Sequence, residues 1–109
     1  MKITKIETIL AGVRYLFVKV YTDAGLVGLG ECGAWCYQEA TAEAIHAMEH
    51  HLIGLDPMQI EYINNGLSRC MHFRGSIVAA AISGIDIALW DLKGKYFGVP
   101  IYELLGGKV

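Results

Sequence analysis

The sequence from Leu16 to Cys32 is LFVKVYTDAGLVGLGEC, which has the composition of a β-hairpin. Its first seven residues are rich in Leu, Phe, Val and Tyr, which favour strands, and residues 26–32 form a second apolar run. The turn DAG between them ends in Gly25, which adopts at little cost the positive φ that a three-residue hairpin loop requires. Gly28 and Gly30 fall on one face of the second strand, where missing side chains let a neighbouring element approach closely.

The residues before this hairpin add a strand, and those after it change to helical spacing. Residues 2–10 alternate apolar and polar side chains and are close enough to the next strand for a second hairpin. From Thr41 onward the apolar residues recur at helical intervals, and Asp56 followed by Pro57 has the pattern of a helix N-cap. The expected strands are residues 2–10, 16–22 and 26–32, and the expected helices are residues 41–54, 56–67, 76–97 and 101–105. This order predicts an α+β fold, a three-stranded antiparallel meander followed by a bundle of three to four helices.

The chain is short and apolar. It has 109 residues, of which 54% are hydrophobic. A single domain of this size removes only about 60–70% of its unfolded surface from water. Apolar surface is therefore expected to remain exposed, and such surface marks an interface with a protein, a domain or a ligand. On this ground we expect a homo-oligomer.

Charge and hydropathy exclude several classes of protein. The formal net charge is -2, and no basic stripe is present to bind a phosphate backbone, so nucleic acid is not an expected partner. The N-terminus lacks the apolar run of a secretory signal. The longest apolar stretch, residues 77–92, is interrupted by two aspartates and is shorter than the ~20 residues that span a bilayer. We expect a cytoplasmic protein that does not bind a membrane.

One segment has the pattern of a zinc site. His46, Glu49 and His50 fit H-x-x-E-H, in which two histidines share one face of a helix. That face also carries Glu39 and Glu43 and lies away from the apolar stripe of the helix. A solvated helix face is therefore the favoured interpretation, and a small zinc hydrolase is the alternative.

The remaining reactive side chains suggest structural roles. Cys32 and Cys36 lack C-x-x-C spacing, and the odd number of three cysteines favours reduced thiols. Asp86 and Asp91 lie in a predicted buried helix, where carboxylates must be paired, and Asp91 is one turn from Lys95. No nucleophile with a partner base and no phosphate-binding loop is found. We expect neither a catalytic residue nor a metal ligand in this chain.

The stretch AISGIDIALWDLKGK at residues 81–95 continues through Val-Pro-Ile at 99–101 to Leu-Leu-Gly at 104–106. This stretch resembles the N-terminal signature of the mandelate racemase and muconate lactonizing enzyme family within the enolase superfamily. Residues 1–6, 21–31 and 52–57 also look like that family's first domain, so the resemblance covers nearly the whole chain. Among the members, the chain most resembles acid-sugar dehydratases of the galactonate dehydratase type.

The resemblance implies that chemistry and capping lie in different domains. In this family the first domain caps a modified TIM barrel, which follows in sequence and supplies Mg²⁺ ligands and a Lys or His base that removes the proton α to a carboxylate. Residues 1–109 are then a single N-terminal capping domain that is not catalytic alone. Its own C-terminal TIM barrel, the Mg²⁺ and a small hydroxy-carboxylate substrate are the expected partners. An acid-sugar dehydratase is the implied activity, and a racemase or a cycloisomerase is the alternative.

The resemblance also implies where the cap contacts the substrate. Residues 11–15 and 31–38 match the loops that close over the barrel's C-terminal face. They carry Arg14, Trp35 and Tyr37, which we predict to be substrate-binding; packing alone is the alternative for the two aromatic rings. A free-standing oligomerisation or ligand-binding module is the alternative to a cap. A coding continuation after Val109, with a Lys-x-Lys strand and spaced Asp and Glu ligands, is expected only for the cap.

Overall fold

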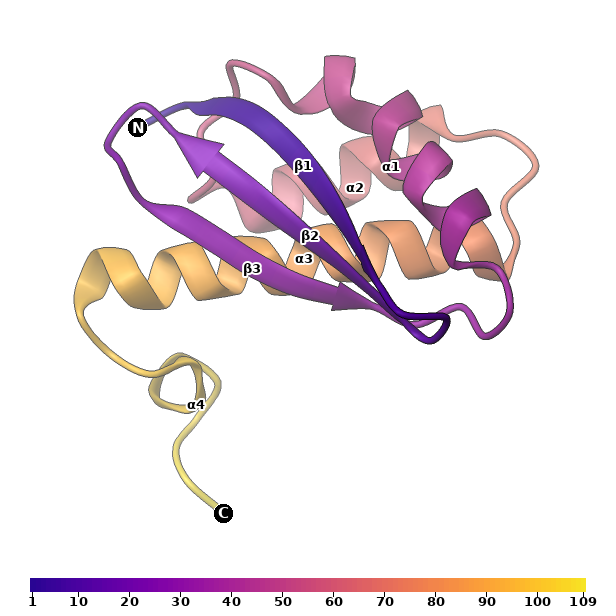
Figure 1. Ribbon diagram of the computed structural model, residues 1–109. Helices are drawn as coiled ribbons and strands as arrows, with labels where there is room; N and C mark the ends of the chain where they lie inside the picture. The colour runs from indigo at the N-terminus through magenta and orange to yellow at the C-terminus, as the bar shows by residue number, and fades with distance from the viewer.

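The computed structural model describes residues 1–109, which form a sheet layer and a helical layer (Figure 1). The strands β1 (Ile3–Ala11), β2 (Tyr15–Thr22) and β3 (Val27–Cys32) form one antiparallel sheet in the order β1-β2-β3. The helices are α1 (Gln38–Leu52), α2 (Ile60–Cys70), α3 (Ser76–Phe97) and α4 (Ile101–Leu104). The predicted α+β class and the meander followed by helices are therefore confirmed.

The core lies between the sheet and the helices that cover one of its faces (Figure 1). Both α1 and α3 contact the sheet, and α2 packs against these two helices. Strand β2 contributes Leu16, Val18 and Val20, which are fully buried because alternate residues of a strand point to the same face. Burial of each such side chain contributes roughly 1.5–3 kcal/mol before conformational entropy is subtracted. The sheet's second face carries no helix.

The start of α2 differs from the prediction. The helix begins at Ile60, and its N-cap is Gln59, three residues after the predicted cap Asp56. The Asp56 carboxylate accepts the backbone N–H of Met58 at 2.9 Å, and the Asp56 carbonyl accepts that of Gln59 at 3.1 Å. Asp56 and the buried Pro57 therefore form a turn before the helix, because a short Asp side chain can bond its own backbone in place of capping. The helix itself is confirmed, but the prediction that Asp56 caps it and Pro57 begins it is wrong.

Glycines let α3 lie directly on β3. A Cβ on Gly28 would run into the carbonyl oxygen of Ala88, and one on Gly30 into that of Gly84. Gly84 in turn faces the Cys32 thiol, and a Cβ there would collide with the sulfur. The close approach predicted from Gly28 and Gly30 is confirmed, and the element that approaches is α3.

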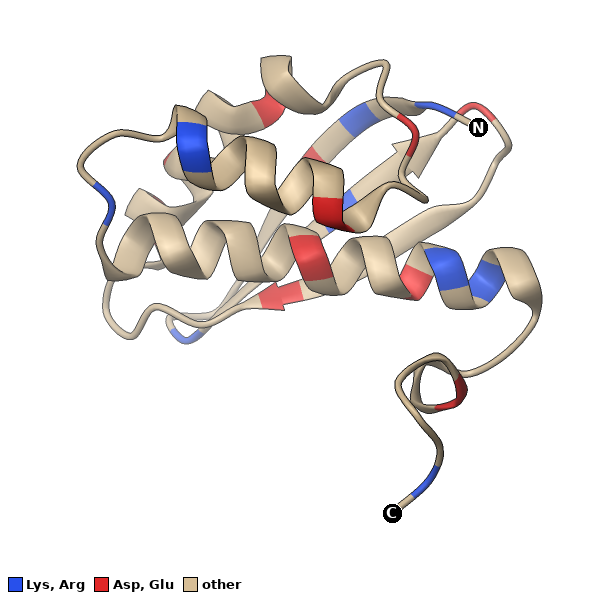
Figure 2. Ribbon diagram, turned by 180° about the vertical axis from the view of Figure 1, so that it is seen from behind, with Lys and Arg blue, Asp and Glu red and all other residues tan.

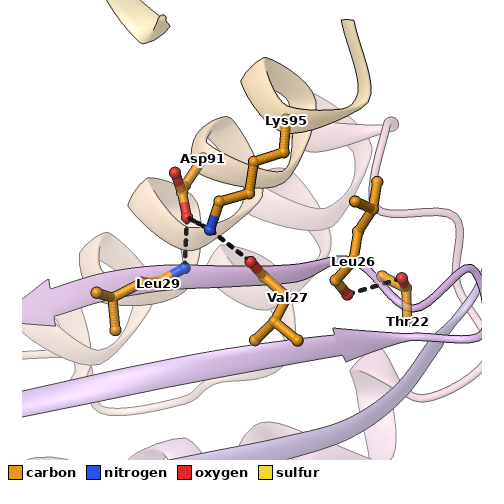
Figure 3. Close-up of polar contacts among 6 residues, drawn as sticks. All are labelled: Thr22, Leu26, Val27, Leu29, Asp91 and Lys95. Carbon is orange, nitrogen blue, oxygen red and sulfur yellow. Dashed lines mark hydrogen bonds and ion pairs between the residues drawn. The ribbon is translucent and has the colours of Figure 1, made fainter. Parts of the chain in front are cut away.

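The edge of β3 is bonded to α3 by one acidic and one basic side chain (Figure 3). Asp91 Oδ2 accepts the backbone N–H of Leu29 at 2.9 Å and pairs with Lys95 Nζ at 2.7 Å. Lys95 Nζ also donates to the Val27 carbonyl at 2.7 Å. The predicted Asp91–Lys95 pair is confirmed, and it occupies polar groups that an edge strand otherwise exposes to strand addition.

Charges of both signs are interspersed along the helices, as the view from behind shows (Figure 2). The ion pairs are Lys95–Asp91 and Lys5–Glu7, and each pair lies within a single element.

None of the helices combines the length and the apolar character that crossing a membrane requires.

Candidate functional site

A pocket of about 910 Å³ lies at one end of the sheet, where the β1–β2 turn meets the β3–α1 loop. Its walls come entirely from residues 10–15 and 31–40, and nine of the 15 lining residues are hydrophobic. Arg14, Trp35 and Tyr37, the three predicted substrate-binding residues, all line it. The volume falls within the ~300–1,000 Å³ that is typical of small-molecule sites.

The β3–α1 loop has an anchored backbone and exposed rings. The Tyr37 carbonyl accepts the backbone N–H and the hydroxyl of the buried Thr41, at 2.9 and 2.8 Å, and the Tyr37 N–H donates to the Ala34 carbonyl. Trp35 is nevertheless 86% exposed and Tyr37 58% exposed. Neither ring packs into the core of this chain, so their large apolar faces are available to a ligand or to another domain.

Arg14 lies in the exposed turn between β1 and β2, where Gly12 supports the turn with a φ of 66°. Its guanidinium takes part in neither ion pair of the structure. An arginine that lines a pocket and has no carboxylate partner is suited to bind a carboxylate or several hydroxyls of a ligand by charge-assisted hydrogen bonds.

Three polar residues of the pocket were not among the predicted substrate-binding residues, although two of them, Glu31 and Gln38, lie in the predicted loop 31–38. Glu31 and Glu39 line it, and Gln38 donates from Nε2 to the Arg14 carbonyl at 2.9 Å. No sequence signal marks Gln38, because its partner lies 24 positions away and is a backbone atom. Glu31 and Glu39 do not form a metal site with a third side chain, since no group of three His, Cys, Asp or Glu side chains is placed to hold a metal. The residues of this chain do not fit a Mg²⁺ site.

The two cysteines next to the pocket differ in environment. Cys32 is buried under α3, and this burial, with a smaller effect of the Glu31 charge, raises its pKa to about 11. A thiol with such a pKa is protonated at neutral pH and is a poor nucleophile. Cys36 is exposed and adopts a φ of 66° in the loop.

The H-x-x-E-H segment of α1 contacts β1. His46 Nε2 lies 3.0 Å from the Thr8 hydroxyl, and the Glu49 carboxylate accepts the Ile6 N–H at 3.4 Å. The residues of the predicted solvated face, Glu39, Glu43, His46 and His50, are exposed as expected, whereas Glu49 beside them is half-buried against the strand. Helical periodicity alone did not reveal this contact, because β1 covers a polar flank of α1 beside its apolar stripe.

Comparisons with known proteins agree over nearly the whole chain. Residues 4–106 match the family model described as mandelate racemase / muconate lactonizing enzyme, N-terminal domain. D-galactonate dehydratase of Pectobacterium atrosepticum is 47% identical over 110 residues, a match that covers 100% of this chain and 29% of that protein.

Two solved structures show the same fold. An enolase from Agrobacterium radiobacter, bound to Na and L-malate, is 35% identical with a TM-score of 0.90, and the match covers 100% of this chain and 29% of that one. The 3,6-anhydro-D-galactonate cycloisomerase of Zobellia galactanivorans is 31% identical with a TM-score of 0.90, over 98% of this chain and 32% of that one. The chain therefore spans about a third of the length of the proteins it matches.

Proposed function

Because the chain belongs to the mandelate racemase / muconate lactonizing enzyme family, as its N-terminal domain, we propose that it caps the active site of an enolase-superfamily enzyme. The proposed partner is a C-terminal TIM barrel of the same protein, which binds Mg²⁺ and removes the proton α to the carboxylate of a small hydroxy-acid. The observation that carries the proposal is the convergence of Arg14, Trp35 and Tyr37 on one pocket, with both rings exposed.

Acid-sugar dehydration is the proposed reaction. The 47% identity to a D-galactonate dehydratase over the whole chain supports it. The second candidate is a cycloisomerase, because the Zobellia galactanivorans cycloisomerase has the same domain at 31% identity. The cap itself does not distinguish the two reactions, because the proposed barrel, and not the cap, supplies the groups that break and form bonds.

The cap's own contribution is binding of the non-reacting part of the substrate and exclusion of water. Closing the pocket over a barrel removes water from the reacting groups, which strengthens electrostatic interactions there. Arg14 is proposed to bind a distal carboxylate or hydroxyls, and the rings of Trp35 and Tyr37 to lie against the carbon chain of the sugar acid. These contacts touch parts of the substrate that do not react, so they act on selectivity.

A fusion protein tests the proposal. It joins this chain to the remainder of the P. atrosepticum D-galactonate dehydratase, in place of the 110 residues that match. With Mg²⁺ and D-galactonate we expect turnover by the fusion and none by the 109-residue chain. Turnover by the chain alone, or equal kcat/KM from the relative's remainder without any cap, would contradict the proposed function.

A further inference from the structure

The two loops of the pocket are joined by one side-chain hydrogen bond. Gln38 is the first residue of α1, and its Nε2 donates to the Arg14 carbonyl oxygen at 2.9 Å. No other side-chain hydrogen bond connects residues 11–15 to residues 33–38. The Arg14 guanidinium is left free, because the bond uses only the backbone of that residue.

The loops differ in how firmly they are held. The β3–α1 loop is fixed to the core through Thr41, which is fully buried and bonds the Tyr37 carbonyl from its backbone and its hydroxyl. The β1–β2 turn is closed by the pairing of Ala11 with Tyr15 but has no contact of this kind with the core: Val13 at its tip is 89% exposed and Arg14 beside it is exposed. A hydrogen bond from Gln38 therefore connects the exposed tip of the turn to the anchored start of a helix.

We propose that Gln38 is a positioning residue that sets the separation between Arg14 and the rings of Trp35 and Tyr37. The inference rests on the proposed function, because it assigns a purpose to the placement of substrate-contacting groups. A bound group must be held within a fraction of an ångström of its productive place, and a misplacement of 1 Å has large kinetic effects. Without Gln38 the turn samples positions in which Arg14 and the rings do not reach one substrate together.

The dynamics of the 109-residue chain provide the direct test. Gln38→Met keeps the length of the side chain and removes the donor, and Gln38→Lys keeps a donor as the matched control. We expect ¹⁵N relaxation to show that Gln38→Met lowers the order parameters of the Val13 and Arg14 amides below about 0.6, the flexible range, with Gln38→Lys close to the parent. Circular dichroism should give similar melting curves for all three proteins. Order parameters in Gln38→Met equal to those of the parent would overturn the proposal.

Kinetics of the fusion protein separate this inference from the proposed function. If both hold, Gln38→Met and Arg14→Ala each raise KM for a long sugar acid, on the order of tenfold, with little change in kcat, because binding of a non-reacting part is lost. If Gln38→Met loosens the turn while neither variant changes KM, the bond exists but the proposed substrate contact is wrong. If Arg14→Ala raises KM and Gln38→Met leaves both KM and the order parameters unchanged, the positioning role alone is refuted.

Discussion

At the residue scale, Cys32 shows how the fold changes the acid–base behaviour of one group. Burial raises its pKa from 9.0 to about 11, so the folded thiol stays protonated at a pH where the unfolded thiol ionises. The unfolded state then binds fewer protons between those two values. The free energy of unfolding should therefore be unaffected by this group below pH 9 and fall by up to about 3 kcal/mol as the pH rises to 11.

Urea unfolding at several pH values measures this dependence. Cys32→Ala is the control, because it removes the titrating group while the lysines and tyrosines that also titrate at high pH remain. The parent should lose more stability than Cys32→Ala between pH 9 and 11. Parallel curves for the two proteins would show that the thiol is not desolvated as the structure indicates.

At the scale of elements, the contact of α3 with β3 depends on glycine. Gly30→Ala should lower the free energy of unfolding by about 1–3 kcal/mol or more, because the new Cβ meets the backbone carbonyl of Gly84, which moves only with the whole helix. Gly66→Ala is the matched control: the Cβ there meets nothing within 4 Å. In the interior of α2 this second change should stabilise the chain by about 0.5–1 kcal/mol. Equal effects of the two substitutions in denaturant titrations would contradict the packing described.

Sequence reasoning succeeded for elements whose signal is local. The Leu, Phe, Val and Tyr content of residues 16–22 predicted a strand, and the spacing of Gly28 and Gly30 on one face of the next strand predicted a close approach. It failed at Asp56, where a side chain that caps helices equally forms a turn, and the sequence Asp-Pro is compatible with both. It also missed Gln38, whose partner is a distant carbonyl that no residue pattern encodes.

The candidate site was predicted only in part. Arg14, Trp35 and Tyr37 were placed by resemblance to a family, and the structure brings their loops together around one pocket. Glu31, although within the predicted loop 31–38, and Glu39 were not singled out from the sequence, because both are charged residues at the ends of elements, where charge is common on any surface. The structure shows that the two loops meet, and this contact assigns residues to the pocket that their residue types alone did not.

At the scale of the whole molecule, apolar side chains remain exposed beyond the pocket. Phe97 at the end of α3 and Leu105 after α4 are 58% and 64% exposed, on the segments that the proposed barrel would cover. We therefore expect the isolated chain to form dimers or larger species in sedimentation experiments. Phe97→Ser and Leu105→Ser should weaken this association, and Val13→Ser, at the opposite end, should not. A stable monomer over a wide concentration range that binds no hydrophobic dye would contradict the expectation.

The central claim is that this chain is a cap that selects substrates through Arg14, Trp35 and Tyr37, and their alanine variants in the fusion protein test it most directly. The measurement is kcat/KM for a long sugar acid and for a short hydroxy-acid, beside the free energy of unfolding. We predict a barrier raised by roughly 1–3 kcal/mol for the long acid, a smaller change for the short one, and stability within about 1 kcal/mol of the parent, because exposed loop side chains contribute little to folding. Variants that melt far below the parent yet keep their kcat/KM would show that the three residues only pack, and the cap's proposed role in selectivity would be wrong.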